Sequence, residues 1–326
     1  MADSMGNSMG ANAPEPSVDV SVIIVTRNRH DVIDQALARL FVSIANTEAA
    51  TEVIVVDAST VASDSLRADT RLRYVYRGDI PYSMVTSRNI GIEEARGRIL
   101  AFIDDDCFVS THWLERIVAG FEDPTVGLVG GRVINHPWAQ VEKSNRVGIL
   151  ELDLDVLEGG FSRCPDGVID VSHLPGGNLA VRTDLAHSVG GFDPGFVGSA
   201  NGEETDFVLR VRQLGHRALF DPAASVEHRA APRSDGIQRS LTNYVYRYSM
   251  VRNRIYFLRK HGARRGVRRS VLRQAKDGLF GVAKGLLETG VFLVATLTAI
   301  VAGLFARVPR TRESDGRKDP FGVKRL

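Results

Sequence analysis

Short apolar runs alternate with helical patterns over the first third of the chain, and this alternation limits the fold more than any other feature. Strand signals lie at residues 18–25, 53–56, 72–76 and 99–103. Residues 31–44 have the apolar spacing of an amphipathic helix, and residues 83–95 also look helical. Alternating strands and helices predict βαβ units, and therefore an α/β domain of Rossmann-like type with a mostly parallel central sheet flanked by helices.

The strand signal at 99–103 stops abruptly in three carboxylates, Asp104, Asp105 and Asp106. The carboxyl end of a strand is where ligands bind in open α/β sheets. Three adjacent carboxylates repel one another unless a cation or hydrogen bonds offset the repulsion. Divalent Mg²⁺ and Mn²⁺ prefer oxygen ligands of this kind and often share them with phosphates. The run therefore predicts a divalent-cation site, with a solvated acidic turn as the alternative.

Charge is divided unevenly along the chain. Residues 1–232 hold 20 Lys and Arg against 33 Asp and Glu, whereas residues 233–326 hold 21 against 6. The basic end predicts a surface that meets polyanions, either nucleic acid or an anionic membrane. Cys107 and Cys164 are the only two cysteines of the sequence, too few for a disulfide framework or a plausible zinc site, which favours a reducing compartment.

The two ends of the chain differ from its middle. Residues 1–17 contain no apolar run, so we expect a disordered leader and no signal peptide. Residues 264–276 predict a basic helix, and residues 289–306 carry no charge. Eighteen such residues are at the lower limit for a membrane span, so a span, an interfacial helix and a soluble helix all stay open.

These boundaries predict a catalytic domain over residues 18–232 and a basic helical tail over residues 233–326. Residues 264–306 would contact anionic lipid, which places the chain at the cytoplasmic face of a membrane. Nucleic acid is not an expected partner, because the tail has neither aromatic residues interleaved on a sheet nor a known motif spacing.

Further polar side chains follow the first two strand signals. Thr26 and Asn28 end the first strand, and Asp57 ends the second. A carboxylate in such a place can accept hydrogen bonds from a base or a ribose, although a turn or a helix cap uses Asp in the same way. Arg88 begins the next helical segment; its planar guanidinium suits phosphate, although most such arginines are simply solvated.

Three later groups add candidates, each weak by itself. Gly176 and Gly177 precede Asn178, and paired glycines allow a backbone to approach a ligand closely. An acidic group opens a predicted helix, where the helix dipole already favours negative charge. His228 follows a short apolar stretch, and a single histidine is more often structural than a ligand. The acidic group consists of Glu203, Glu204 and Asp206.

In order, the chain reads VSVIIVTRNR, VVDAST, SRNIGIEEARGRILAFIDDDC, GGNLAVR, GGFD, GEETDFVLR, VEH and RN. This series resembles the family-two glycosyltransferases of the GT-A fold over about residues 18–260. The resemblance implies an inverting, metal-dependent transfer of a hexosyl- or deoxyhexosyl-type sugar from a nucleotide-diphosphate donor carrying UDP, GDP or dTDP. The acceptor would be a glycan or a lipid-linked molecule in cell-envelope or other polysaccharide or glycolipid synthesis.

The resemblance also implies roles for the residues above. The three aspartates become a DxD motif, in which Asp106 and Asp105 bind Mn²⁺ or Mg²⁺, His228 adds a ligand, and Asp104 lies near the ribose or the metal. The nucleotide would be held by Thr26, Asn28, Asp57 and Arg88. The donor sugar and the acceptor would be bordered by Gly176, Gly177 and Asn178.

The general base is the residue on which this sequence departs from the family pattern. The family has Glu-Asp where this chain has Glu203-Glu204, so the base falls on Glu204. A glutamate places its carboxylate farther out by about 1.5 Å, one C–C bond. Misplacement on that scale can cost roughly 100-fold in rate, so Glu203 and Asp206 stay as alternatives.

Two other functions compete with this interpretation. A nucleotidyltransferase of similar fold would have a glycine-rich phosphate loop after the first strand, where this chain has Thr26-Arg-Asn-Arg. A membrane-tethered GT-A scaffold with weak or no catalysis is supported by the departure at Glu204 alone.

Overall fold

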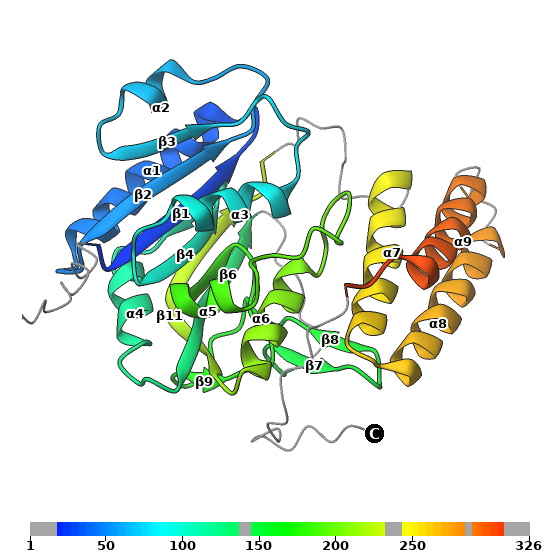
Figure 1. The fold of residues 1–326 in the computed structure, drawn as a ribbon. Coiled ribbons are helices and arrows are strands. Elements are labelled where there is room, and N and C mark those ends of the chain that lie inside the picture. Colours follow the sequence, from blue (N-terminus) through cyan, green and yellow to red (C-terminus); the bar gives the residue numbers. More distant parts are fainter. Residues whose placement is uncertain (1–17, 137–144, 232–242, 284–288, 310–326) are drawn as a thin grey trace, which may run out of the picture.

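The computed structural model describes residues 18–136, 145–231, 243–283 and 289–309. It is an α/β structure built on a sheet in the order β3-β2-β1-β4-β10-β6-β11-β5, with β9 paired to β11 (Figure 1). The sequence-based prediction of a mostly parallel α/β sheet flanked by helices is confirmed. The leader expected at residues 1–17 lies outside the described residues.

Parallel strands form the first half of the sheet, as the alternation predicted. Four strands pair in parallel with no break in register, and the helix α1 (His30–Ala45) follows the first of them. The helix α3 (Met84–Glu94) leads into the strand that ends in the aspartates. These strands are β1 (Val20–Thr26), β2 (Thr51–Asp57), β3 (Leu72–Tyr76) and β4 (Ile99–Asp104).

The second half of the sheet is mixed. β10 (Asn178–Arg182) runs antiparallel to both β4 and β6 (Val126–His136). The long strand β11 (Arg217–Arg229) lies parallel to β6 and antiparallel to β5 (Cys107–Val109) and β9 (Ile169–Asp170). A separate hairpin pairs β7 (Ile149–Glu151) with β8 (Val156–Glu158).

Helices cover both faces of the sheet, because strands with long buried runs need apolar partners on each side. On one face, α1 and α4 (Trp113–Ala119) pack Ile33, Leu40 and Trp113 against the strands, next to the short α2 (Asp64–Ala68). On the other face lie α3, α5 (Thr183–Ser188) and α6 (Glu203–Gln213), with Phe207 buried in that core.

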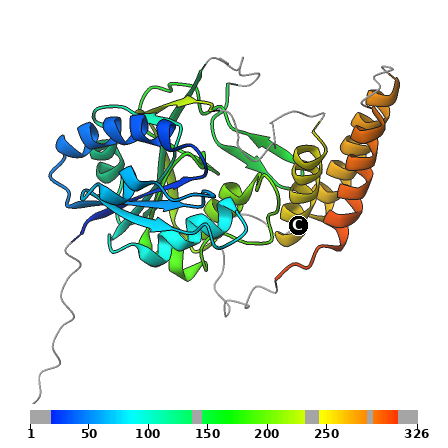
Figure 2. The same cartoon turned by 90° about the horizontal axis from the view of Figure 1, so that it is seen from above.

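Three helices at the C-terminal end stand beside the sheet, at the end away from β3 (Figures 1 and 2). They are α7 (Tyr244–Lys260), α8 (Arg264–Ala283) and α9 (Thr289–Phe305). The basic helix and the apolar helix expected from the sequence are therefore present. A small core of Val251, Ile255, Ala299 and Ile300 joins α7 to α9. Within the ranges that the structure describes, no helix is both long and apolar enough to cross a bilayer.

Candidate active site

The parallel register brings the polar ends of three strands to one edge of the sheet. Thr26 of β1 lies opposite Asp57 of β2, and Val25 lies opposite Asp104 of β4. The carboxyl ends of β1, β2 and β4 therefore meet where ligands bind in open α/β sheets.

The three aspartates do not act as one group. Asp104, Asp106 and Cys107 have ligand atoms within 4.8 Å of one another, whereas Asp105 is not part of that group. The Asp105 side chain is fully buried, where Thr26 Oγ1 donates a hydrogen bond of 2.8 Å to it and Arg29 pairs with it at 2.6 Å. Asp105 is thus held within the protein in the turn that follows β4, and its role as a metal ligand stays a prediction.

Asp106 is held by cationic neighbours on two sides. The Arg29 guanidinium lies 3.0 Å from its carboxylate, and His228 Nε2 lies 3.3 Å from it. The backbone N–H of Ala231 also donates to it at 3.1 Å. Burial opposes the charged form, but His228 and Arg29 outweigh it and lower the pKa of Asp106 to about 2. Burial raises the pKa of Asp105 to about 7.

This donor set fits Mn²⁺ or Mg²⁺. Asp104 and Asp106 offer carboxylate oxygens, which these hard cations prefer. His228 donates from Nδ1 to Asn135 Oδ1 at 2.7 Å, which turns Nε2 toward Asp106 and suits a ligand. Burial raises the pKa of the Cys107 thiol well above its usual value, so the sulfur stays protonated and is a poor ligand.

Two of the expected nucleotide contacts are occupied within the protein. The Thr26 hydroxyl is used by Asp105. Asp57 is fully buried and accepts hydrogen bonds from Tyr74 (2.6 Å) and the Ser59 N–H (2.9 Å), with His30 Nε2 also 2.9 Å away. Burial and the bond to Asp57 raise the pKa of Tyr74 to about 12. Thr26 and Asp57 therefore support the loops of the site rather than present free groups to a ligand.

Asn28 remains at the surface of this edge. It has a positive φ of 52°, a conformation that asparagine tolerates better than most residues. Its Oδ1 accepts from the Thr60 N–H at 2.9 Å, so it ties the loop after β1 to the loop after β2. The loops after β1 and β2 are therefore held together next to the carboxyl end of β4.

Arg88 connects the aspartates to the acidic start of α6. It is buried and donates to Glu203 at 2.5 Å, to Asp104 at 3.0 Å and to the Gly176 carbonyl at 3.0 Å. Burial alone would lower the pKa of this guanidinium, but Glu203 and Asp104 raise it, so the charge is retained. Arg88 thus ties Asp104 to the start of α6.

The paired glycines are explained by close approach. A Cβ on Gly176 would lie 3.1 Å from an Arg88 nitrogen and 3.2 Å from Glu204 Cβ. A Cβ on Gly177 would lie 2.8 Å from Asp104 Oδ2. Gly177 thus leaves room for the Asp104 carboxylate, and Gly176 leaves room for the side chains of Arg88 and Glu204.

Gly177→Ala is expected to displace the Asp104 carboxylate and lower Mn²⁺-dependent activity by roughly tenfold to 100-fold. The measurement is the Mn²⁺ concentration at half-maximal activity, which should rise. Gly159→Ala is the matched control, because a Cβ there meets only the Phe161 ring at 3.3 Å. Equal activity of the two variants would contradict the role given to Gly177.

Glu204 is the half-buried member of the acidic trio. It follows Gly202, whose positive φ of 89° begins α6. Burial raises the pKa of Glu204, and the Asp104 carboxylate adds to the shift. A carboxylate with a raised pKa is a better proton acceptor than an ordinary glutamate. Glu203, in contrast, is buried against Arg88, although burial also raises its pKa.

Asp206 is an anchor and not a free base. Its fully buried carboxylate meets Arg210 (2.8 Å), Lys260 (2.9 Å) and His261 (2.9 Å). Burial opposes its ionisation, but these partners hold the pKa of Asp206 well below its usual value. The alternative of Asp206 as a base is therefore corrected.

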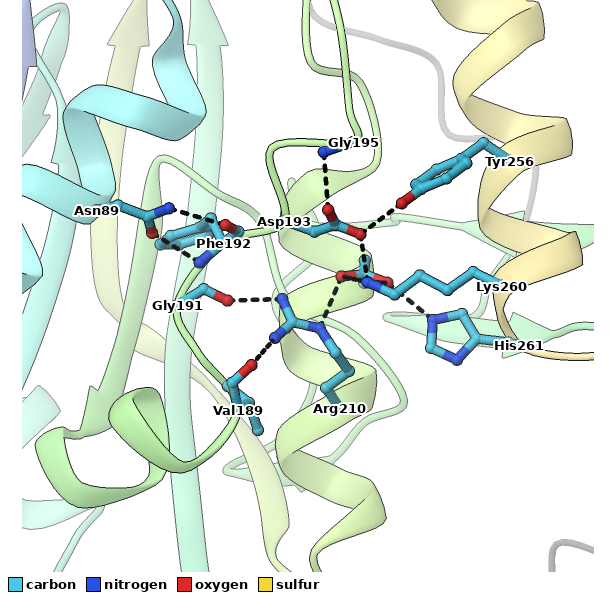
Figure 3. A network of polar contacts seen from close by, with 11 residues as sticks. Asn89, Val189, Gly191, Phe192, Asp193, Gly195, Arg210, Tyr256, Lys260 and His261 are labelled. Atoms are coloured by element: carbon cyan, nitrogen blue, oxygen red, sulfur yellow. Dashed lines mark hydrogen bonds and ion pairs between the residues drawn. The ribbon is translucent and has the colours of Figure 1, made fainter. Parts of the chain in front are cut away.

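The same network fixes the loop before α6. Asp193 pairs with Lys260 at 2.5 Å and accepts from Tyr256 at 2.8 Å. Asn89 of α3 bonds both the N–H and the carbonyl of Phe192 (Figure 3). The GGFD motif of the sequence thus joins α3, α6 and α7.

Asn178 is also occupied within the protein. It is fully buried at the start of β10, where Trp113 Nε1 donates to its Oδ1 at 2.9 Å. Its Nδ2 donates to the Ala224 carbonyl at 2.8 Å. The side chain thus bridges β10, β11 and α4, and the place of Asn178 beside donor and acceptor stays a prediction.

Sequence reasoning missed Arg29, Lys260 and His261. Arg29 stands in the VTRNR motif, yet no pattern shows that it reaches residues 77 positions away. Lys260 and His261 lie at the end of α7, whose bounds the predicted helical tail did not give. Each acts across the fold, which local spacing cannot reveal.

Comparison with known proteins agrees with this geometry. The family model "Glycosyl transferase family 2" matches residues 21–173. Pre-mycofactocin glycosyltransferase of Mycobacterium tuberculosis is 31% identical over 219 residues, covering 64% of this chain and 42% of the relative. Succinoglycan biosynthesis protein ExoM of Rhizobium meliloti is 27% identical, covering 56% of this chain and 57% of the relative. The chain spans less than half the length of the first of these relatives.

Solved structures share the fold at low sequence identity. The mannosyltransferase PcManGT from Pyrobaculum calidifontis, in complex with GDP-Man and Mn²⁺, is 17% identical with a TM-score of 0.53, covering 90% of this chain and 89% of that one. S. aureus TarS 1–349 is 15% identical with a TM-score of 0.57, covering 87% and 80%.

Proposed function

Because this chain belongs to glycosyl transferase family 2, we propose that it transfers a hexosyl-type sugar from a nucleotide-diphosphate donor to an acceptor hydroxyl with inversion at the anomeric carbon. One observation carries the proposal. Gly176 and Gly177 bring the Asp104 carboxylate and the half-buried Glu204 to the two sides of one backbone turn. This arrangement supports a donor sugar bound between a cation-binding group and a base.

Each side chain has a separate part in the transfer. Arg88 faces the donor diphosphate. Asn28 and Asp57 hold the loops after β1 and β2, on which the nucleoside lies. Glu204 accepts the proton of the acceptor hydroxyl as that oxygen forms its bond to the anomeric carbon. The bond from the anomeric carbon to the diphosphate oxygen breaks at the same time, and the nucleoside diphosphate leaves with the electron pair.

Asp104 and Asp106, with His228, would hold Mn²⁺ or Mg²⁺. When bound, such a cation neutralises charge on the diphosphate and improves it as a leaving group. Glycans or lipid-linked molecules of envelope or polysaccharide synthesis are the acceptors we propose, in line with the printed name of the relative ExoM.

A donor screen tests the proposal directly. Purified protein is incubated with UDP-, GDP- and dTDP-sugars, with Mn²⁺ or with EDTA, and nucleoside diphosphate release is measured. We expect hydrolysis of one donor class with Mn²⁺ alone. Product formed from an α-linked donor should be β-linked, and a retained α configuration would overturn the inverting mechanism.

Asp106→Ala is expected to abolish Mn²⁺-dependent release while the protein stays folded, because Asp106 supplies one of the two carboxylates of the cation group. Nucleoside diphosphate release and circular dichroism are the two measurements. Asp153→Ala, which removes a carboxylate outside this group, is the control. Full Mn²⁺-dependent release by Asp106→Ala would contradict the assignment.

We also propose that the C-terminal helices contact an anionic membrane at its cytoplasmic face. Val294, Leu297, Val301 and Phe305 recur at helical spacing on α9 and are half or more exposed. Arg264, Arg265, Arg268 and Arg269 of α8 are exposed as well. Apolar and basic side chains together suit the surface of a negatively charged leaflet.

Vesicle sedimentation checks this contact. The protein should pellet with phosphatidylcholine vesicles that contain phosphatidylglycerol, and much less with phosphatidylcholine alone. The double variant Leu297→Ser, Val301→Ser should remain in the supernatant, while Val61→Ser, an exposed apolar residue of the sheet domain, serves as control. Equal pelleting of all three proteins would contradict the proposal.

A further inference from the structure

A cavity of about 180 Å³ lies between the start of α6 and the helices α7 and α8. This is several times the roughly 30 Å³ that one water occupies in the liquid. Gly202 and Thr205 of α6, Arg247 and Arg254 of α7, and Arg273 and Gln274 of α8 are among its lining residues. Among the described residues that line it there are three arginines and no acidic side chain.

Three guanidinium groups converge on this cavity. Arg254 and Arg273 share one carboxylate, that of Asp155, at 2.7 and 2.5 Å. Arg247 donates to Thr296 Oγ1 at 3.1 Å and to Gln274 Oε1 at 2.8 Å. The Asp277 carboxylate supports the charge of Arg247. The described lining of the cavity itself contributes guanidinium groups but no carboxylate.

Burial makes these charges costly. Arg247 is only 5% exposed, and burial lowers the pKa of both Arg247 and Arg254. A buried cation gains most from an anion that comes within hydrogen-bond distance. Guanidinium groups match the oxygens of a phosphate by their planar fork of donors.

The cavity lies at the start of the helix that carries the proposed base, although Glu204 is not one of its lining residues. Gly202 and Thr205 line it, and Glu204 lies between them in the first turn of α6. The donor diphosphate would meet Arg88 and the aspartates on the sheet side of Glu204. The arginine-lined cavity is formed by the helical unit instead, so it is separate from the groups that would face the donor.

We propose that this cavity binds a phosphate group of the acceptor and thereby presents the acceptor hydroxyl to Glu204. The proposal rests on the proposed function for its account of the acceptor. It names an acceptor class, phosphate-bearing molecules, and leaves the source of the phosphate to the experiment, since a lipid phosphate and a soluble phosphate offer the same oxygens.

Gln274→Glu is the decisive variant. Glu keeps the size of Gln and still accepts the bond from Arg247, so the fold should be kept, but it adds a carboxylate to the cavity. Binding of sn-glycerol 3-phosphate, measured by isothermal titration calorimetry, should weaken about tenfold or more. The added carboxylate competes with the phosphate for Arg247, and one charge-assisted hydrogen bond contributes about that factor to the affinity. Arg247→Gln should weaken it similarly. Arg268→Gln, which removes an exposed charge of the same helix α8 outside the cavity, should change it little.

Two further probes separate the outcomes. Farnesyl phosphate in phosphatidylcholine vesicles tests a lipid source, and loss of its binding in Gln274→Glu supports the proposal with a lipid acceptor. Loss of glycerol 3-phosphate binding alone supports it with a soluble one. Unchanged binding of both probes overturns it, as does tighter binding of glucuronate, which would assign the cavity to carboxylates.

The same protein samples are tested for Mn²⁺-dependent donor hydrolysis. Hydrolysis that persists in Gln274→Glu while phosphate binding is lost separates the cavity from the donor site. Hydrolysis that is absent from the wild type would overturn the proposed function, whereas the calorimetry would still decide whether the cavity binds phosphate.

Discussion

Glu204→Gln is expected to lower transfer and donor hydrolysis by about 100-fold to 10,000-fold, the range that general-base catalysis contributes. The amide keeps the shape of the side chain but cannot accept the proton. Donor binding should stay unchanged, because Arg88 and the aspartates face the donor from the other side of the glycine pair. Nucleoside diphosphate release measures the first effect, and a thermal shift with donor and Mn²⁺ measures the second.

The pH dependence of the rate has a defined sign. The base works only when ionised, and burial raises the pKa of Glu204 above 4.5. The rate should therefore fall as the pH falls through this raised pKa, and the acid limb should lie above the range of an ordinary glutamate. An acid limb at or below pH 4.5 would contradict the assignment.

Glu204→Asp and Glu203→Gln are the matched controls. Glu204→Asp withdraws the carboxylate by about 1.5 Å, one C–C bond, and should cost on the order of 100-fold if the site is built for the longer side chain. Glu203→Gln leaves Arg88 paired with Asp104. A larger loss in Glu203→Gln than in Glu204→Gln would move the base to Glu203.

Asp206→Ala is expected to destabilise the protein by about 3–5 kcal/mol, the cost of removing one partner of a buried ion pair. Arg210 and His261 would lose the carboxylate that they share, and Lys260 would keep Asp193 alone. The free energy of unfolding in urea is the measurement. Asp79→Ala removes a carboxylate paired with Arg77 at the exposed surface and should have no measurable effect. Equal stability of both variants would contradict the anchor.

The parallel half of the fold was predictable because its signals are local. The run Leu72–Tyr76 forms β3 with the bounds that the sequence predicted, and Ile99–Ile103 forms all of β4 but its last residue. The long strand β11 was missed because polar and charged residues such as Asp221 and Glu227 interrupt its apolar pattern. The bounds of α7 were not predicted within the helical tail, because its arginines surround the helix and Arg247 is buried inside the protein.

The sequence indicated which residues lie at the site, but not what each side chain contacts there. The motifs named Asp105, Asp57 and Asn178, yet each is buried and bonded within the protein. A motif marks a position in the chain, whereas the direction of the side chain depends on neighbours far away in sequence. Thr26 and Trp113 supply such neighbours for Asp105 and Asn178.

The bond between Asp206 and Lys260 has a consequence for where the chain could be shortened. A chain ending at residue 232 would keep all the sheet strands and the aspartates, but it would lose Lys260 and His261. The turn that carries Glu204 would lose part of its support in such a chain, and the main core would lose Tyr256, Phe257 and Leu258 of α7. The sheet domain thus depends for its stability on a helix that lies beyond residue 232.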